Sequence, residues 1–185
     1  MRASLPVSWT VVVLMTVAGC ATATTAPAPL APPITLDQLD AARYADRPCD
    51  LLTPERLAQL RLAAPGAVEH TADGTVCGWT AQAPAHTSLS AGVDRKRTLE
   101  DLYRRRPEFA TFGPIDIAGY PAVNTTGGGQ AAPGACTAHV AVADTATVTV
   151  TADEAGTGQP GSADPCPEAD KIATAIVGQL EAGSP

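Results

Sequence analysis

The chain has 185 residues and a net charge of −7 at neutral pH, and aromatic residues make up 4% of it. This length gives room for one domain with a terminal extension, and the low aromatic content predicts a modest core of Val, Leu, Ile and Ala. The acidic balance argues against nucleic acid as a partner, because phosphates repel a negatively charged surface.

The N-terminus begins with a positive residue, Arg2, followed by a mainly apolar run from Leu5 to Ala18. This order of regions is typical of a secretory signal peptide. A transmembrane anchor is the first alternative, but the run is shorter than the roughly 20 apolar residues that a spanning helix needs. A secreted protein cleaved elsewhere is the second alternative. We therefore expect residues 1–19 to be removed on export.

The signal ends in Val17-Ala18-Gly19-Cys20, which looks like a bacterial lipobox. In a lipobox the cysteine thiol takes a diacylglyceryl group before the signal is cleaved. Of the five cysteines, four remain when Cys20 is set aside, and an even number suits a disulfide framework. We therefore predict a lipoprotein attached through Cys20 to the extracytoplasmic face of the cell membrane.

Residues 20–47 are expected to form a tether and a lead-in to the domain. The first part, Ala21 to Pro33, is rich in Ala, Thr and Pro and should be extended with polyproline character. A bare spacer is favoured over one whose threonines carry O-linked sugar. The second part, Ile34 to Arg47, has weak apolar spacing and fits either an extended segment or a weak helix.

A single domain is predicted over residues 48–182, with a tail at 183–185. Thr53-Pro54 should start a helix, because a hydroxyl caps its N-terminus and proline suits its first position. Strands are expected around Val76–Trp79 and Leu89–Val93. Thr98-Leu99-Glu100-Asp101 resembles a capping box and should start a second helix that Pro107 ends.

The second half of the domain has the clearest patterns. Ile115 and Ile117 should form a strand that continues through Gly119–Val123, and a glycine-rich loop is expected over Thr125–Gly134. Apolar residues then alternate with polar ones over Cys136–Val142 and over Thr145–Ala152, which predicts an antiparallel hairpin with a threonine face. The apolar stripe of 169–180 has helical spacing. The fold class is therefore α+β, an antiparallel sheet with helices packed mainly on one face and two disulfides.

Cys49, Cys77, Cys136 and Cys166 allow three disulfide pairings. The predicted elements favour Cys49–Cys77 with Cys136–Cys166, because each bond would join a helix to the strand that it covers. Zinc binding is disfavoured, since zinc sites usually draw on cysteines a few residues apart. A redox role is disfavoured as well, because the chain has no Cys-x-x-Cys.

No motif for catalysis stands out. His70 and His86 fall in expected turns and His139 on the threonine face, so each is predicted to be a solvated histidine. The chain has neither a Gly-x-Ser-x-Gly elbow nor a phosphate-binding loop. We therefore expect no enzyme activity, no cofactor and no metal.

Six basic residues flank the second helix and form a candidate patch for an anionic partner. They are Arg95, Lys96, Arg97, Arg104, Arg105 and Arg106. The favoured alternative is an ordinary solvated helix, because Glu100, Asp101 and Glu108 lie nearby in the sequence.

Several short motifs, taken in order, resemble a known family. They are Pro48-Cys49-Asp50-Leu51-Leu52, Cys77-Gly78-Trp79, Gly119-Tyr120-Pro121-Ala122, Cys136 before an alternating strand, and Cys166 opening an Ala-rich helix. Together with the lipobox they resemble actinobacterial lipoproteins that carry the domain of unknown function numbered 3558. The resemblance implies an anchored envelope protein with paired cysteines and supplies no activity. The six basic residues are not part of this pattern, so no role carries over to them.

Two functions of different classes follow. The first is a non-catalytic, monomeric module that binds an envelope protein or a small ligand, either on the threonine face or at the basic patch. A purely structural surface protein is not separable from it by sequence. The alternative is an envelope hydrolase or transferase acting on wall or lipid material, which requires at least two histidines or acidic groups to converge in one pocket.

Overall fold

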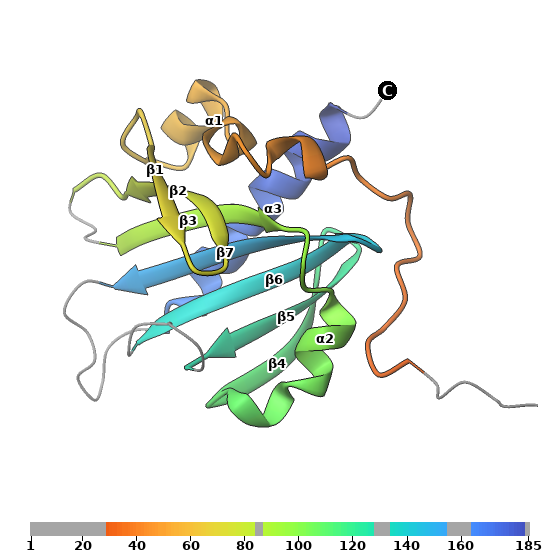
Figure 1. The fold of residues 1–185 in the computed structure, drawn as a ribbon. Helices are drawn as coiled ribbons and strands as arrows, with labels where there is room; N and C mark the ends of the chain where they lie inside the picture. The colour runs from red at the N-terminus through yellow and green to blue at the C-terminus, as the bar shows by residue number, and fades with distance from the viewer. Residues whose placement is uncertain (1–28, 84–86, 128–133, 155–163, 184–185) are drawn as a thin grey trace, which may run out of the picture.

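The computed structural model describes residues 29–83, 87–127, 134–154 and 164–183. The lipobox, Cys20, residues 21–28 of the tether and His86 lie outside the described residues. The described chain forms one seven-stranded antiparallel sheet with the order β1-β2-β3-β7-β6-β5-β4 (Figure 1). The predicted α+β class is confirmed.

The strands are β1 (Ala67–Thr71), β2 (Gly74–Thr80), β3 (Thr87–Asp94), β4 (Thr111–Ile117), β5 (Tyr120–Thr126), β6 (Ala135–Ala143) and β7 (Ala146–Glu154). The helices are α1 (Pro54–Gln59), α2 (Leu99–Arg104) and α3 (Cys166–Ala182), with short 3-10 helices at Ala42–Tyr44, Pro48–Leu51 and Arg106–Glu108. Both predicted helix starts are confirmed, since Thr53 caps α1 and Thr98 forms a capping box with Asp101 at the start of α2.

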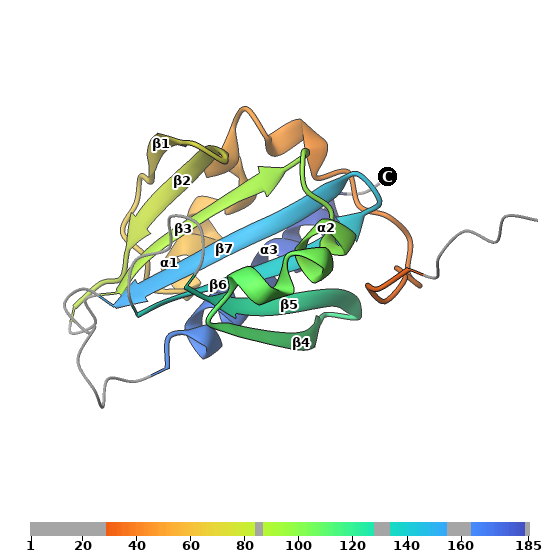
Figure 2. The ribbon, with the colours of Figure 1, turned by 60° about the horizontal axis from the view of Figure 1, so that its bottom comes forward.

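The two faces of the sheet have different coverings. On one face, α3 and the segment containing α1 enclose the main core (Figure 1). The apolar stripe of α3 is completely buried there and consists of Ala169, Ile172, Ala173, Ile176, Val177 and Leu180. On the opposite face, α2 packs through Leu99 and Leu102 against Val123 and Ala141 and leaves the rest of that face uncovered by helices (Figure 2).

The core also includes residues that precede Pro48. Leu39, Ala41 and Ala45 are buried in it, and the Leu39 amide donates a hydrogen bond to the Val142 carbonyl. The Tyr120 hydroxyl donates to the Asp37 carbonyl at 2.7 Å. The segment expected as a lead-in is therefore an ordered layer of the domain, with one turn of 3-10 helix in it.

Two strands differ from the expectation. All five residues of β1 are exposed, so this edge strand has no apolar alternation by which it could be recognised. The segment 115–123, expected as one continuous strand, is part of the hairpin β4–β5, and β5 extends through Thr125 and Thr126, which were expected in the glycine-rich loop. Residues 128–133 of that loop lie outside the described residues. The turn residues of the hairpin, Ala118 and Gly119, have φ of 53° and 86°, the signs that a two-residue hairpin turn of type I′ requires.

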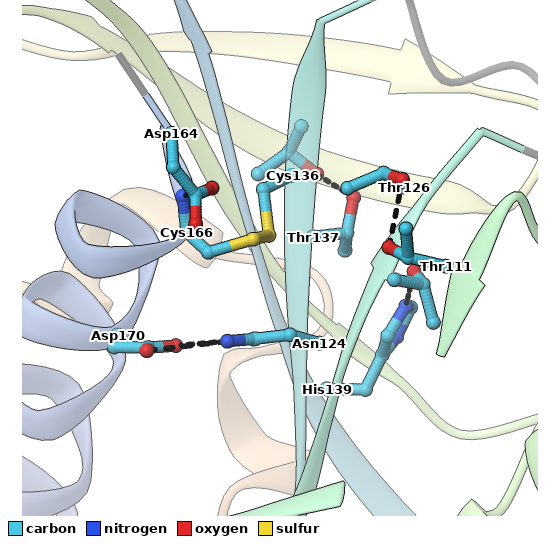
Figure 3. The surroundings of a disulfide bond; sticks show 11 residues. Thr111, Asn124, Thr126, Cys136, Thr137, His139, Asp164, Cys166 and Asp170 are labelled. Carbon is cyan, nitrogen blue, oxygen red and sulfur yellow. Dashed lines mark hydrogen bonds between the residues drawn. A yellow bond between two sulfur atoms is a disulfide. The ribbon is translucent and has the colours of Figure 1, made fainter. Parts of the chain in front are cut away.

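The two favoured disulfides are confirmed. Cys49, in the 3-10 helix before α1, bonds to Cys77 in β2. Cys136, at the start of β6, bonds to Cys166, the first residue of α3 (Figure 3). Each bond therefore joins a helical segment to the sheet.

Candidate functional site

A groove with a volume of about 540 Å³ lies on the sheet face that α2 only partly covers. It crosses the strands from β1 to the α2 side, so its floor is formed by residues of β2, β3, β7 and β6. Leu102, Arg105 and Phe109 border it on the α2 side, and Glu69 and Thr71 border it on the β1 side. The groove is large enough for a small molecule.

Several side chains with hydroxyl groups lie along the floor of the groove. Thr137 and Thr151 are hydrogen-bonded to each other at 2.9 Å, and the Thr149 hydroxyl donates to the Gly92 carbonyl. Thr80, Ser88 and Ser90 continue the same face toward β1. A hydroxyl both donates and accepts, so this floor can match several arrangements of polar ligand groups.

The threonine face predicted from the alternation is thus largely the groove floor, with two differences. Thr145 lies in the turn before β7 and outside the groove. Thr147 is buried, because the loop before α2 covers it and its hydroxyl donates to the Arg97 carbonyl at 3.2 Å.

His139 lies in the floor and is 8% exposed, so the prediction of a solvated histidine is wrong at this position. The covering of α2 and its preceding loop, which the strand pattern does not reveal, explains the error. Its Nε2 is 3.1 Å from the Thr125 hydroxyl. Burial, helped by the positive charge of Arg97 and opposed by Asp94 and Asp73, lowers the pKa of His139 to about 4. The imidazole is therefore neutral at pH 7.

Arg97 ties the two sides of the groove together. Its Nε donates to Asp94 at 2.7 Å, and its Nη2 is 3.2 Å from Asp73 in the turn between β1 and β2. Asp94 is itself buried, and its carboxylate accepts hydrogen bonds from the backbone amides of Lys96 and Arg97. Burial acts to lower the pKa of Arg97, but the two carboxylates outweigh it and the net shift is upward. The β1–β2 hairpin is thereby attached to the loop that leads into α2.

The structure separates the six basic residues predicted as a patch. Arg97 and Arg105 line the groove, whereas Arg95, Lys96, Arg104 and Arg106 do not. Acidic side chains offset most of the positive charge of the six residues. The distances from the guanidinium nitrogen to the carboxylate oxygen are 2.7 Å for Arg105 and Glu108, 3.0 Å for Arg104 and Glu100, and 4.0 Å for Arg95 and Asp46.

Two other carboxylates of the groove, Glu69 in the edge strand β1 and Asp153 near the end of β7, have a different environment. Glu69 and Asp153 line the groove, and neither has a basic partner among the described residues. Glu69 lies directly over Gly78, where the Cβ of any other residue would collide with its carboxylate. Gly78 therefore gives the Glu69 side chain its place on the groove face.

The histidines do not converge. His70 is exposed on β1 and contacts Thr75 at 3.3 Å, so the prediction of a solvated histidine holds although it lies in a strand and not in a turn. Because neighbouring strand residues alternate, His70 points away from the face that Glu69 shares with the groove. Within the described residues, no group of three His, Cys, Asp or Glu side chains could hold a metal ion.

A half-buried polar pair lies on the opposite face, beside the second disulfide. The Asn124 amide donates to the Asp170 carboxylate on α3 at 2.9 Å, while His139 lies on the other side of the strands (Figure 3). Burial raises the pKa of Asp170, although the Asn124 hydrogen bond opposes it. Sequence reasoning missed this pair, because only the packing of α3 on β5 brings the two residues together.

These observations define a disulfide-linked α+β domain with a ligand-sized groove across its sheet, lined in part by hydroxyl groups. A family model described as "Protein of unknown function (DUF3558)" matches residues 15–179, so the chain belongs to this family. Searches of the curated proteins and of the solved structures find no match. None of the described helices is long and apolar enough to cross a membrane.

Proposed function

We propose that the protein is a lipid-anchored lipoprotein of the cell envelope whose groove is a non-catalytic binding site for a small polar ligand. The groove carries the second half of this proposal, because it combines a preformed concavity with a floor of hydroxyl groups. The lipobox at Val17–Cys20 supports the anchor. The two disulfides support an extracytoplasmic location, because disulfides persist in oxidising compartments.

The residues of the groove favour binding over catalysis. The hydrogen-bond partner of His139 among the described residues is the Thr125 hydroxyl and not a carboxylate, so the imidazole has no acidic partner there to orient it as a general base. Its lowered pKa also leaves it a weak base near neutral pH. A hydrolase or transferase would need catalytic groups that the described part of the groove does not bring together. We expect the protein to act as a monomer.

The anchor is tested by fractionating cells that produce the wild type or Cys20→Ala. The wild type should be found with the membrane, and the variant should be released or retained as an uncleaved precursor of higher mass. Cleaved, membrane-bound Cys20→Ala would contradict the lipid attachment.

The groove is tested by NMR mapping of polar fragments on the 15N-labelled domain. Shift changes should cluster at Ser88, Ser90 and Thr137, and they should disappear in Thr151→Trp, which fills the floor. Thr145→Trp is the matched control, because it introduces the same ring in an exposed turn outside the groove. Shift changes that cluster elsewhere, or that survive Thr151→Trp, would refute the site.

A further inference from the structure

The basic and acidic residues of the groove differ in what they can offer to a ligand. Arg97 already pairs with Asp94 at 2.7 Å and with Asp73 at 3.2 Å, and Arg105 pairs with Glu108 at 2.7 Å. Glu69 in the edge strand β1 and Asp153 near the end of β7 have no basic partner among the described residues. An anionic ligand would have to displace Asp73 or Glu108, whereas a cationic ligand would meet unpaired carboxylates. The charges of the groove therefore favour a positively charged ligand.

Hydroxyl groups lie between the two carboxylates. Ser88 pairs with both Thr80 and Asp153, and Ser90 pairs with both Gly78 and Thr151, so these positions form adjacent rows across the strands. From the spacing of strands and of residues along them, the carboxylate over Gly78 and that of Asp153 are roughly 12 Å apart. The three hydroxyls of Thr80, Ser88 and Ser90 line the space between them and make no side-chain hydrogen bond within the described structure.

We propose that the groove ligand is an amine-bearing polyol, with amino sugars as the representative class, and that Glu69 and Asp153 bind its ammonium groups. The inference rests on the groove being the binding site. An ammonium group has three donors and no acceptor, so it matches a carboxylate, and charge-assisted hydrogen bonds of this kind are the stronger ones. Ligand hydroxyls then exchange hydrogen bonds with Thr80, Ser88 and Ser90. Phe109 and Leu102 also line the groove and supply apolar surface.

The test compares two probes that differ in the amine alone, a β-1,4-linked glucosamine tetramer and its fully N-acetylated form. Isothermal titration calorimetry with the wild-type domain should show binding of the first and at least about tenfold weaker binding of the second, because acetylation removes the charge. Binding of the glucosamine tetramer should also weaken as salt is raised.

The residues are tested with Glu69→Gln combined with Asp153→Asn, which should weaken binding of the glucosamine tetramer about tenfold or more. Glu181→Gln is the control, since it removes one carboxylate from the exposed end of α3. Glu69→Asp keeps the charge and should retain most of the binding. An unchanged affinity in the double variant would overturn the assignment of these two carboxylates.

The remaining outcomes separate this inference from the proposed function. If both tetramers bind equally well and Thr151→Trp abolishes this binding, the assignment of ammonium groups as the bound groups is wrong, and the groove remains the binding site. If neither tetramer binds while polar fragments still map to the groove, the ligand class is wrong and the site stands. If neither tetramers nor fragments perturb the groove residues, both proposals fall.

Discussion

The buried His139 makes the stability of the domain depend on pH in a defined direction. Its pKa in the folded state is about 4, below the unfolded value near 6.5. Between these two values the unfolded chain binds a proton at this residue and the folded protein does not. Lowering the pH through this window therefore favours unfolding, and below pH 4 both states are protonated and the loss is complete.

The size of this effect follows from the width of the window. One pH unit corresponds to about 1.4 kcal/mol per proton, so the interval from about 6.5 to about 4 costs about 3 kcal/mol of stability. That loss is a large share of the 5–15 kcal/mol that is typical of a folded domain.

The assay is urea unfolding of the wild type and of His139→Gln at pH 7, 6, 5 and 4, with both disulfides intact. Glutamine does not titrate and can still bond to Thr125. Carboxylates such as Asp101 and Asp170, whose pKa values are shifted by hydrogen bonds and by burial, titrate equally in both proteins and cancel in the comparison. The wild type should lose about 3 kcal/mol more than the variant between pH 7 and 4.

His70→Gln is the matched control, because it makes the same substitution at an exposed position of β1. Its unfolding free energy should follow the wild type at every pH. If His139→Gln and the wild type lost the same free energy on acidification, the buried, neutral imidazole would be refuted.

The remaining predictions concern the elements that hold the groove and the core. Replacing Cys136 and Cys166 together by Ser should cost about 3–4 kcal/mol in urea unfolding, because the bond closes a loop with a sequence separation of 30; an unchanged midpoint would contradict it. Thr98→Ala removes the capping box of α2 and should cost about 1 kcal/mol, measured in the same way, and an equally stable variant would show that the cap is dispensable. Asn124→Asp places a second carboxylate against Asp170, so it should be less stable than the wild type at pH 7, and this difference should shrink at pH 4 as protonation removes the repulsion. A difference that did not change with pH would refute that cause.

The elements with a strong local pattern were predictable. The stripe of α3 and the alternation of β6 and β7 arise because one side of each element faces the core, and that requirement is written into the residues themselves. The caps of α1 and α2 were predictable for a similar reason, because their hydrogen bonds connect residues three apart. The disulfide pairing followed once each helix had been assigned to its strand.

The features that the sequence did not predict have the opposite cause, because their residues carry no strong local pattern. The strand β1 buries none of its side chains, so it is held by backbone pairing with β2 and leaves no hydrophobic pattern. Leu39 and Ala41 belong to the core although their segment has only weak periodicity. The burial of such residues depends on which distant parts of the chain pack against them.

The candidate site shows the same division. The threonine face and the basic residues were both visible in the sequence, but as two separate surfaces. Only the position of α2 across β5 and β6 brings Arg97 and Arg105 to the edge of the threonine face and buries His139. Local sequence patterns therefore determine the helix caps, the apolar stripe of α3 and the alternation of β6 and β7, because those depend on neighbours a few residues away. The groove, the neutral histidine and the unpaired carboxylates depend on residues far apart in sequence, and tertiary packing alone decides which of them share a surface.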